Sequence, residues 1–208
     1  MDRIKPLRII ENRAAPNCRR VRIFLAEKGI EIPYDQIDIM AGDHFKTEYK
    51  EKVGTYRVPV LELSDGSFLT ESIAICRFFE MEKPKIPLFG RTQLEISLVE
   101  MWQRRMEFEL LWPIAFVLRH GNPKMIVLED QCEAWSVANR PRVLVGLETL
   151  NKQLAHNQFI VGSNFSVADI TAIVAVNFLR TIRVEIPEHL EFLLNWKATV
   201  SQRSSIGA

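Results

Sequence analysis

Arg57-Val58-Pro59-Val60-Leu61 is followed, twelve residues after its proline, by Glu71-Ser72, and these two segments constrain the fold most. Pro59 stands where a strand should begin, and a residue without a backbone N–H belongs at a strand start or a sheet edge. X-Pro bonds also adopt the cis form at a cost of only about 0.5–1 kcal/mol, and a cis turn here would leave backbone N–H and C=O groups facing outward. Glu71-Ser72 opens a predicted helix, whose first turn offers unpaired N–H groups and partial positive charge to a carboxylate. Together the two segments predict a binding site for a short acidic peptide.

The segment before residue 82 alternates strand and helix patterns. Apolar residues recur at three- and four-residue steps from Cys18 to Leu25, and Gly29 is well placed to end that helix. The tripeptide Ser64-Asp65-Gly66 between two apolar runs predicts a hairpin. The predicted elements, in order, are a strand at 7–10, a helix at 18–29, a strand at 34–39, a polar region at 40–56, a hairpin at 59–63 and 67–70, and a helix at 72–81. This order predicts a mixed sheet in an α/β domain.

The rest of the chain carries helix patterns without comparable strand signals. Two capping boxes, Thr92-x-x-Glu95 and Ser166-x-x-Asp169, open predicted helices, and Ser166 and Asp169 are interpreted as structural. The first predicted helix covers 92–119, with a kink at Pro113. A second helix follows a bend or boundary at Pro141, and its apolar face is formed by Val143, Leu147, Leu150 and Leu154. Two further helices are predicted at 167–179 and 188–201. The proline-rich segment Lys83-Pro84-Lys85-Ile86-Pro87 is a natural linker. The sequence therefore predicts a domain at 1–82, a linker at 83–90 and an all-α domain at 91–208.

The overall composition is that of an ordinary soluble globular protein. Hydrophobic residues make up 47% of the chain, and 27 Lys and Arg nearly balance 26 Asp and Glu, so the charge gives no argument for nucleic acid or membrane binding. No run of 18 apolar residues and no signal peptide is visible. Cys18, Cys76 and Cys132 are scattered, which favours free thiols in a reducing compartment. We expect a cytoplasmic protein without a metal.

The whole arrangement resembles the cytosolic glutathione transferase family, in its bacterial form. The diagnostic segments, in this order and spacing, are Val58-Pro59, Glu71-Ser72-Ile73-Ala74-Ile75 and Phe165-Ser166-Val167-Ala168-Asp169-Ile170. Cys18 to Ile23 and Ala26 to Ile30 also look like the first helix of bacterial members. The resemblance implies a thioredoxin-like N-terminal domain followed by an all-helical C-terminal domain.

The resemblance also implies a glutathione site. It implies that the backbone of Val58, next to the cis-proline Pro59, pairs with the cysteinyl part of glutathione. It also implies that Glu71 binds the ammonium of the γ-glutamyl end and that Ser72 binds its carboxylate. Relatives often contact the glycyl carboxylate where His44 and Arg57 stand. The alternatives without a ligand are a simple strand start at Pro59, an N-cap at Ser72, and a solvated surface pair at His44 and Arg57.

The residues that would activate the glutathione thiol depart from the family pattern. Relatives place a tyrosine, serine or cysteine before the first helix, whereas here Ala15 occupies the position of the usual nucleophile or hydroxyl donor. Asn17 resembles the asparagine of bacterial members with a Thr-Pro-Asn loop, and its amide could donate to the sulfur together with the helix N–H groups. Cys18 is the second catalytic candidate, through a mixed disulfide. Its alternative is a buried core thiol in phase with Val21 and Leu25.

The co-substrate pocket is expected between the domains, along the long helix that begins near Thr92. Candidate contributors at helical spacing are Trp102, Arg105, Met106 and Glu109, for which domain packing is the alternative. The predicted function is conjugation of glutathione to small, mostly apolar electrophiles, as in detoxification. The alternatives are a glutathione-dependent disulfide or peroxide reductase and a non-catalytic binding protein of the same fold. By analogy with the family we also expect a homodimer.

Overall fold

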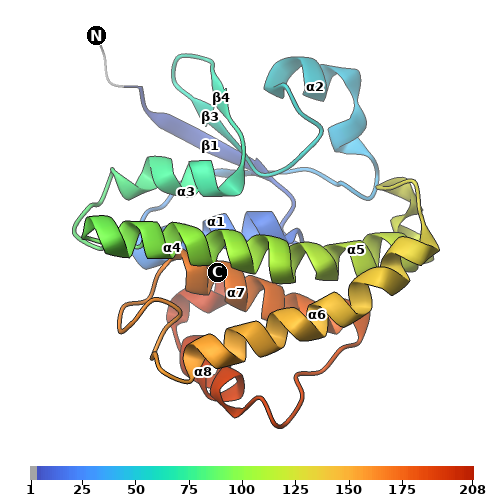
Figure 1. Ribbon diagram of the computed structural model, residues 1–208. Helices are drawn as coiled ribbons and strands as arrows, with labels where there is room; N and C mark the ends of the chain where they lie inside the picture. Colours follow the sequence, from blue (N-terminus) through green and yellow to red (C-terminus); the bar gives the residue numbers. More distant parts are fainter. Residues whose placement is uncertain (1–3) are drawn as a thin grey trace. The chain divides into compact units, whose positions relative to one another are not determined.

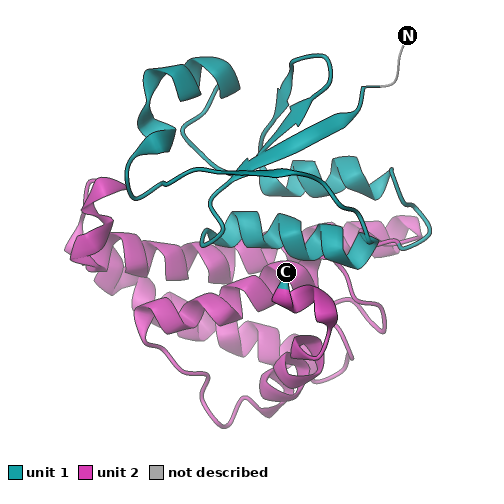
Figure 2. Ribbon diagram, turned by 180° about the vertical axis from the view of Figure 1, so that it is seen from behind, with its two compact units in different colours: residues 1–86, 208 teal, residues 87–207 magenta. Residues whose placement is uncertain are grey.

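The computed structural model describes residues 4–208, and contacts within the chain separate residues 1–86 and 208 (unit 1) from residues 87–207 (unit 2) (Figure 2). Unit 1 is built from short strands and helices. In order they are β1 (Pro6–Glu11), α1 (Pro16–Lys28), β2 (Tyr34–Gln36), η1 (Asp43–Phe45), α2 (Thr47–Val53), β3 (Val60–Leu63), β4 (Phe68–Leu69) and α3 (Ser72–Glu80). The predicted strands, hairpin and flanking helices are confirmed, and α2 fills part of the region expected to be polar.

The four strands of unit 1 form one mixed sheet in the order β2-β1-β3-β4. β1 pairs with β2 in parallel and with β3 in the antiparallel sense, and β3 and β4 form the antiparallel hairpin. Figure 1 shows α1 and α3 side by side on one face of this sheet, with α2 away from them. This is the thioredoxin-like arrangement that the resemblance implies.

Two polar or flexible residues set the ends of elements in unit 1. Gly29 ends α1 in the left-handed conformation at φ 57°, and its N–H is directed at the carbonyls of Leu25 and Ala26, as predicted. β2 is shorter than the predicted strand at 34–39. It ends early because the Asp38 carboxylate accepts hydrogen bonds from the backbone N–H groups of Met40 (2.8 Å) and Ala41 (3.1 Å), which turns the chain.

Unit 2 is helical throughout its described residues. Its elements are α4 (Gln93–Arg105), η2 (Met106–Leu111), α5 (Trp112–Gly121), η3 (Pro123–Val127), α6 (Glu133–Leu154), α7 (Val167–Phe178), η4 (Leu179–Ile182), α8 (Glu191–Ser201) and η5 (Ser204–Gly207). Within residues 87–207 the only β interaction is an isolated bridge between Phe159 and Gly162. Among the helices of residues 4–208, none has both the length and the apolar character required to cross a membrane.

The capping box at Ser166 is confirmed in full. The Asp169 carboxylate accepts hydrogen bonds from the backbone N–H and the hydroxyl of Ser166, and it also accepts from the N–H of Ile160 and from Nε1 of Trp196. Asp169 is fully buried, and burial raises its pKa to about 6. A single buried carboxylate therefore fixes the start of α7 to the preceding loop and to α8, in agreement with a structural role.

Both prolines of the long helices lie within continuous helix, which corrects two details of the sequence prediction. α4, η2 and α5 form one rod (Figure 1), but its irregularity is a π-helical segment that begins at Met106, before Pro113. Proline has no N–H to donate to the carbonyl four residues earlier, Glu109, and a wider turn accommodates this loss. Pro141 lies inside α6 and is not a boundary. The carbonyl that it leaves without a helical donor belongs to Val137, whose side chain is exposed.

The π segment also determines a close helix contact at Gly146 of α6. A Cβ at this position would lie 2.4 Å from the carbonyl oxygen of Glu109. Such a distance is too short for any side chain, and the atom that it would strike belongs to the backbone. The absence of a side chain at Gly146 therefore lets α6 pack directly against η2.

We expect Gly146→Ala to destabilise the protein by about 1–2 kcal/mol, because overpacking of about 1–3 kcal/mol exceeds the helix propensity gained from alanine. Chemical denaturation followed by circular dichroism measures the free energy of unfolding. Gly207→Ala is the matched control, since a Cβ there meets nothing within 4 Å. Equal stability of the two variants would show that the contact between η2 and α6 does not constrain the packing.

Candidate functional site

The Val58–Pro59 segment leads directly into β3. The peptide bond between these residues is cis, Pro59 is buried and Val58 is half-buried. Among residues 4–208, neither the N–H nor the C=O of Val58 has a hydrogen-bond partner. A partly exposed main-chain donor and acceptor next to a sheet are the groups with which an extended peptide can pair.

Glu71 and Ser72 form the start of α3. Glu71 is the N-cap residue, with φ 67° and ψ 113°, a backbone conformation that is unfavourable for any residue with a side chain. Its carboxylate is exposed, whereas the side chain of Ser72, the first helical residue, is buried. Neither side chain caps the helix, so the N-cap alternative for Ser72 does not hold. Strain of this kind, of about 1–3 kcal/mol, is typical of functional sites.

Arg20, a residue that the sequence analysis missed, lies behind Ser72. Its Nη1 donates a hydrogen bond of 2.6 Å to the Ser72 hydroxyl, and both side chains are buried. A fully buried guanidinium next to a helix N-terminus brings a permanent positive charge to the place where a carboxylate is expected. The signal was present in the sequence, because Arg20 lies between Cys18 and Val21 on the helix that was predicted to face the core.

The loop between β1 and α1 ends at the N-terminus of α1. Ala15 is the N-cap and has no side-chain acceptor for the first N–H groups, and Pro16 follows at the first helical position. The carboxamide of Asn17, in the first turn, makes no hydrogen bond within the described residues, and its Oδ1 is buried. Internal contacts therefore leave the Asn17 amide and the helix N–H groups available to a ligand.

Polar side chains outside the predicted site hold this loop in place. The Asn12 side chain donates a hydrogen bond of 3.0 Å to the carbonyl of Ile37 and accepts one of 3.2 Å from the N–H of Ala14. Arg22 forms a buried ion pair with Glu11 at 2.7 Å and donates a hydrogen bond of 2.6 Å to the carbonyl of Arg13. These contacts tie the loop to the sheet and to α1, so the approach to Asn17 has a defined backbone.

Cys18 lies on the inner face of α1. Its side chain is fully buried, and burial raises the pKa of the thiol to about 12. A thiol of this kind carries almost no thiolate at neutral pH and is out of reach of a soluble disulfide. These features favour the core-thiol alternative for Cys18.

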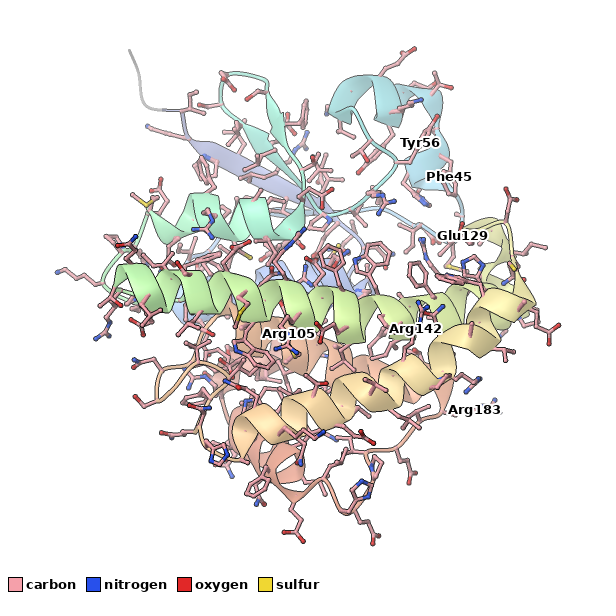
Figure 3. All side chains as sticks on the ribbon, viewed as in Figure 1. Phe45, Tyr56, Arg105, Glu129, Arg142 and Arg183 are labelled. Carbon is pink, nitrogen blue, oxygen red and sulfur yellow. The ribbon has the colours of Figure 1, made fainter. Side chains whose placement is uncertain are left out.

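His44 and Arg57 lie on the connection between β2 and β3. His44, in η1, is buried, and its ring centroid is 3.9 Å from that of Phe45, which in turn is 5.8 Å from that of Tyr56 (Figure 3). The Arg57 side chain is exposed, and its carbonyl accepts a 2.8 Å hydrogen bond from Tyr49. The solvated-pair alternative therefore does not describe His44, which is buried, whereas the Arg57 side chain lies at the surface.

Comparison with known proteins adds an independent line of evidence. Residues 14–82 match the family described as "Glutathione S-transferase, N-terminal domain", and residues 114–204 match "Glutathione S-transferase, C-terminal domain". The chain is 33% identical over 202 residues to Glutathione S-transferase 2 of Saccharomyces cerevisiae. The aligned residues cover 95% of this chain and 87% of the yeast protein. The chain belongs to the glutathione S-transferase family. The resemblance is thereby confirmed.

Solved structures of this transferase family agree in fold. A glutathione S-transferase domain-containing protein from Marinobacter aquaeolei superimposes with a TM-score of 0.92 at 33% identity, covering 96% of this chain and all of the other. Gtt2 of Saccharomyces cerevisiae gives a TM-score of 0.91 at 32% identity, covering 97% of this chain and 99% of the other. The chain is therefore a transferase of a family whose members use glutathione as co-substrate. Its thioredoxin-like and helical units are those of the family.

The four candidates for the co-substrate pocket of the transferase divide into two kinds. Trp102 and Met106 are buried in α4 and η2, which pack on α7. Arg105 and Glu109 are partly exposed and form an ion pair at 3.1 Å, and the Arg105 guanidinium lies 4.3 Å from the centroid of the Trp102 ring (Figure 3). Helix packing accounts for the first two residues, and only the second two present polar groups at a surface.

The strain at Glu71 gives a stability test that is separate from transferase activity. We expect Glu71→Gly to be more stable than Glu71→Ala by about 1 kcal/mol. Glycine relieves strain of about 1–3 kcal/mol, whereas its extra unfolded-state entropy costs about 0.5–1 kcal/mol. Both variants lose the carboxylate, so their difference in thermal and urea denaturation isolates the backbone. A Glu71→Ala variant as stable as Glu71→Gly would show that this conformation carries no strain.

Proposed function

We propose that the chain transfers glutathione to small, mostly apolar electrophiles, with the glutathione held by unit 1. The arrangement at the start of α3 carries this proposal: an exposed carboxylate in a strained N-cap, followed by a hydroxyl that a buried arginine supports. Glutathione presents an ammonium next to a carboxylate at its γ-glutamyl end. Glu71 matches the ammonium, and Ser72, supported by Arg20 and by the N–H groups of α3, matches the carboxylate.

The remainder of glutathione fits the other parts of the proposed site. The N–H and C=O of Val58, next to Pro59, pair with the main chain of the cysteinyl residue. His44 and Arg57 interact with the glycyl carboxylate, for which the exposed Arg57 guanidinium provides charge and two parallel donors. In this scheme backbone pairing sets the position of the tripeptide, and charge at its two ends sets its direction.

The thiol of glutathione becomes reactive when it loses its proton. In our proposal the Asn17 amide donates a hydrogen bond to the sulfur, and the N–H groups at the N-terminus of α1 stabilise the thiolate. The sulfur then forms a bond to the electron-poor carbon of the electrophile, either by addition or with departure of a leaving group, and the thiol proton passes to water. Ala15 cannot take part, and Cys18 has no chemical role in this scheme because its thiol is buried and protonated.

Two further expectations follow from the family. Arg105 and Glu109 are the polar candidates for contact with the electrophile, and Trp102 and Met106 support the helix that carries them. A homodimer stays an expectation by analogy. Exposed apolar side chains on α4, at Leu94 and Met101, are compatible with a covered face on that helix.

We expect Asn17→Ala to lower the rate of glutathione conjugation to a chloronitrobenzene at least tenfold at neutral pH. A hydrogen bond to a charged acceptor contributes about 1.5–3 kcal/mol, and its loss corresponds to a decrease in rate of at least about tenfold. The pKa of bound glutathione, read from thiolate absorbance, should rise, because the thiolate loses its donor. Asn17→Asp is the sharper variant, since its carboxylate repels the thiolate and should raise that pKa further.

Three outcomes would change the assignment. An unchanged rate and thiolate pKa in both Asn17 variants would remove Asn17 from the mechanism. Reduction of hydroxyethyl disulfide by glutathione much faster than conjugation would favour the reductase alternative. Absence of turnover with either substrate, despite glutathione binding, would favour the non-catalytic alternative.

The binding half of the proposal has its own test. We expect Glu71→Gln and Ser72→Ala each to weaken the affinity for glutathione at least fivefold by calorimetry, since each removes one charge-assisted contact. Glu51→Gln on α2 and Ser67→Ala in the hairpin turn are matched controls with exposed side chains. Parent-like affinity in both site variants would place the glutathione elsewhere.

A further inference from the structure

Unit 2 contains a pocket of its own, with a volume of about 320 Å³. Pockets of roughly 300–1,000 Å³ hold small organic molecules. The lining residues come from the end of α5 and the following connection, from α6, and from η4 and its C-cap: Val117, Leu118, Gly121, Asn122, Pro123, Arg140, Thr181, Ile182 and Arg183. None of these residues belongs to the proposed glutathione site, so the pocket needs a separate explanation.

Two arginines from different elements give this pocket its charge. Arg140 comes from α6 and Arg183 from the C-cap of η4, and no carboxylate is among the lining residues. Within the described part of the chain, neither guanidinium forms a hydrogen bond or ion pair. Two permanent positive charges at one hollow, without an internal counter-ion, favour an anionic guest.

The backbone fixes the position of Arg183. It is one of two non-glycine residues within residues 4–208 with positive φ, at 56°, and its N–H closes η4 by donating 3.3 Å to the carbonyl of Arg180. The preceding residue, Ile182, is buried and anchors the turn. Figure 3 shows the Arg183 side chain at the outer edge of unit 2. A residue held in a left-handed conformation at an open pocket is consistent with a binding role.

A further donor and an apolar wall complete the pocket. Asn122 uses its Oδ1 to cap η3 and its carbonyl to accept from Gln131, which leaves its Nδ2 without a partner in the described structure. The Thr181 hydroxyl donates a hydrogen bond to the carbonyl of Phe178, so toward a ligand it can only act as an acceptor. The aliphatic wall comes from the side chains of Val117, Leu118, Pro123 and Ile182.

The carboxylate of Glu129 does not cancel the charge of the two arginines, because it is paired with another residue. Glu129, on the connection after η3, pairs with Arg119 at 3.1 Å (Figure 3). The lining of the pocket therefore contributes two positive side chains and no negative one, although the whole chain carries a formal net charge of only +1.

We propose that this pocket binds a small phosphorylated metabolite, with its phosphate at Arg140 and Arg183 and its organic part on the aliphatic wall. A phosphate monoester carries close to two negative charges at neutral pH, which matches two guanidinium groups, whereas a carboxylate would neutralise only one. Guanidinium donors also fit phosphate oxygens in pairs. The Asn122 amide adds a neutral donor for a third oxygen.

Phenyl phosphate is a suitable probe because it combines a dianion with a compact apolar ring. The protein, saturated with S-hexylglutathione to occupy the proposed glutathione site, is titrated with phenyl phosphate and followed by TROSY NMR. We expect the backbone amides of Gly121, Asn122 and Arg183 to shift in a saturable way. The affinity should decrease from phenyl phosphate to benzoate, and phenol should not produce these shifts.

Variants locate the interaction on the two arginines. Arg140→Gln and Arg183→Asn should each weaken phenyl phosphate binding at least fivefold, and asparagine is chosen at 183 because it tolerates the left-handed conformation. Arg180→Gln is the matched control, since Arg180 is exposed on η4 but does not line the pocket. Parent-like affinity in both pocket variants, an equal loss in the control, or shifts confined to residues outside the pocket would overturn the proposal.

Discussion

The hydrogen bond from Arg20 to Ser72 connects the two helix starts on which the proposed glutathione site depends. Arg20 lies one turn after the first residue of α1, and Ser72 is the first residue of α3, so a contact between residues 52 apart in sequence sets one helix N-terminus against the other. The first of these termini would stabilise the thiolate, and the second would bind the γ-glutamyl end. Because both partners are buried, removal of either one leaves an unsatisfied polar group, which makes the contact expensive to break.

The same pair of helices is also fixed at the opposite end. Lys28, the last residue of α1, is buried and pairs with Glu80, the last residue of α3, at 2.5 Å. Its ammonium also donates to the carbonyls of Lys83 and Ile86. Buried ion pairs add little net stability compared with apolar packing, but they penalise any arrangement in which the partners separate. Polar contacts at both ends therefore favour a single register of α1 against α3, and the spacing between the two parts of the proposed site depends on this register.

The sequence predicted well those features that depend on local chemistry. Gly29 as a helix stop, the turn at Ser64-Asp65-Gly66 and the capping box at Ser166 each act within a few residues, so their signals are complete in the sequence. The π segment at Met106 was missed because its cause, Pro113, lies downstream, and because the packing of Gly146 on Glu109 involves residues far apart in sequence. Helical periodicity still passes through such a segment almost undisturbed.

The candidate site shows the same division. Segments with a distinctive local sequence pattern, such as Val58-Pro59 and Glu71-Ser72, were identified directly, whereas Arg20 was not, because its role depends on a long-range contact with Ser72. The pocket at Arg140 and Arg183 was also missed, since four separate elements, α5, η3, α6 and η4, form it. A residue that contacts a near neighbour in sequence is part of a recognisable sequence pattern. A residue that contacts a partner distant in sequence is recognisable only as an unusual side chain on an apolar face.

The replacement of the usual hydroxyl or thiol by Ala15 has a consequence for how the proposed site responds to pH. Three weak acids of unit 1, Cys18, Tyr34 and Tyr49, have pKa values that burial raises to about 12. These three groups keep their protons across the physiological range. Asn17 does not titrate, and the backbone N–H groups of α1 have a fixed polarity. In the proposed scheme the charge of this donor set is therefore constant near neutral pH, and the ionisation that would control conjugation there is that of the glutathione thiol itself.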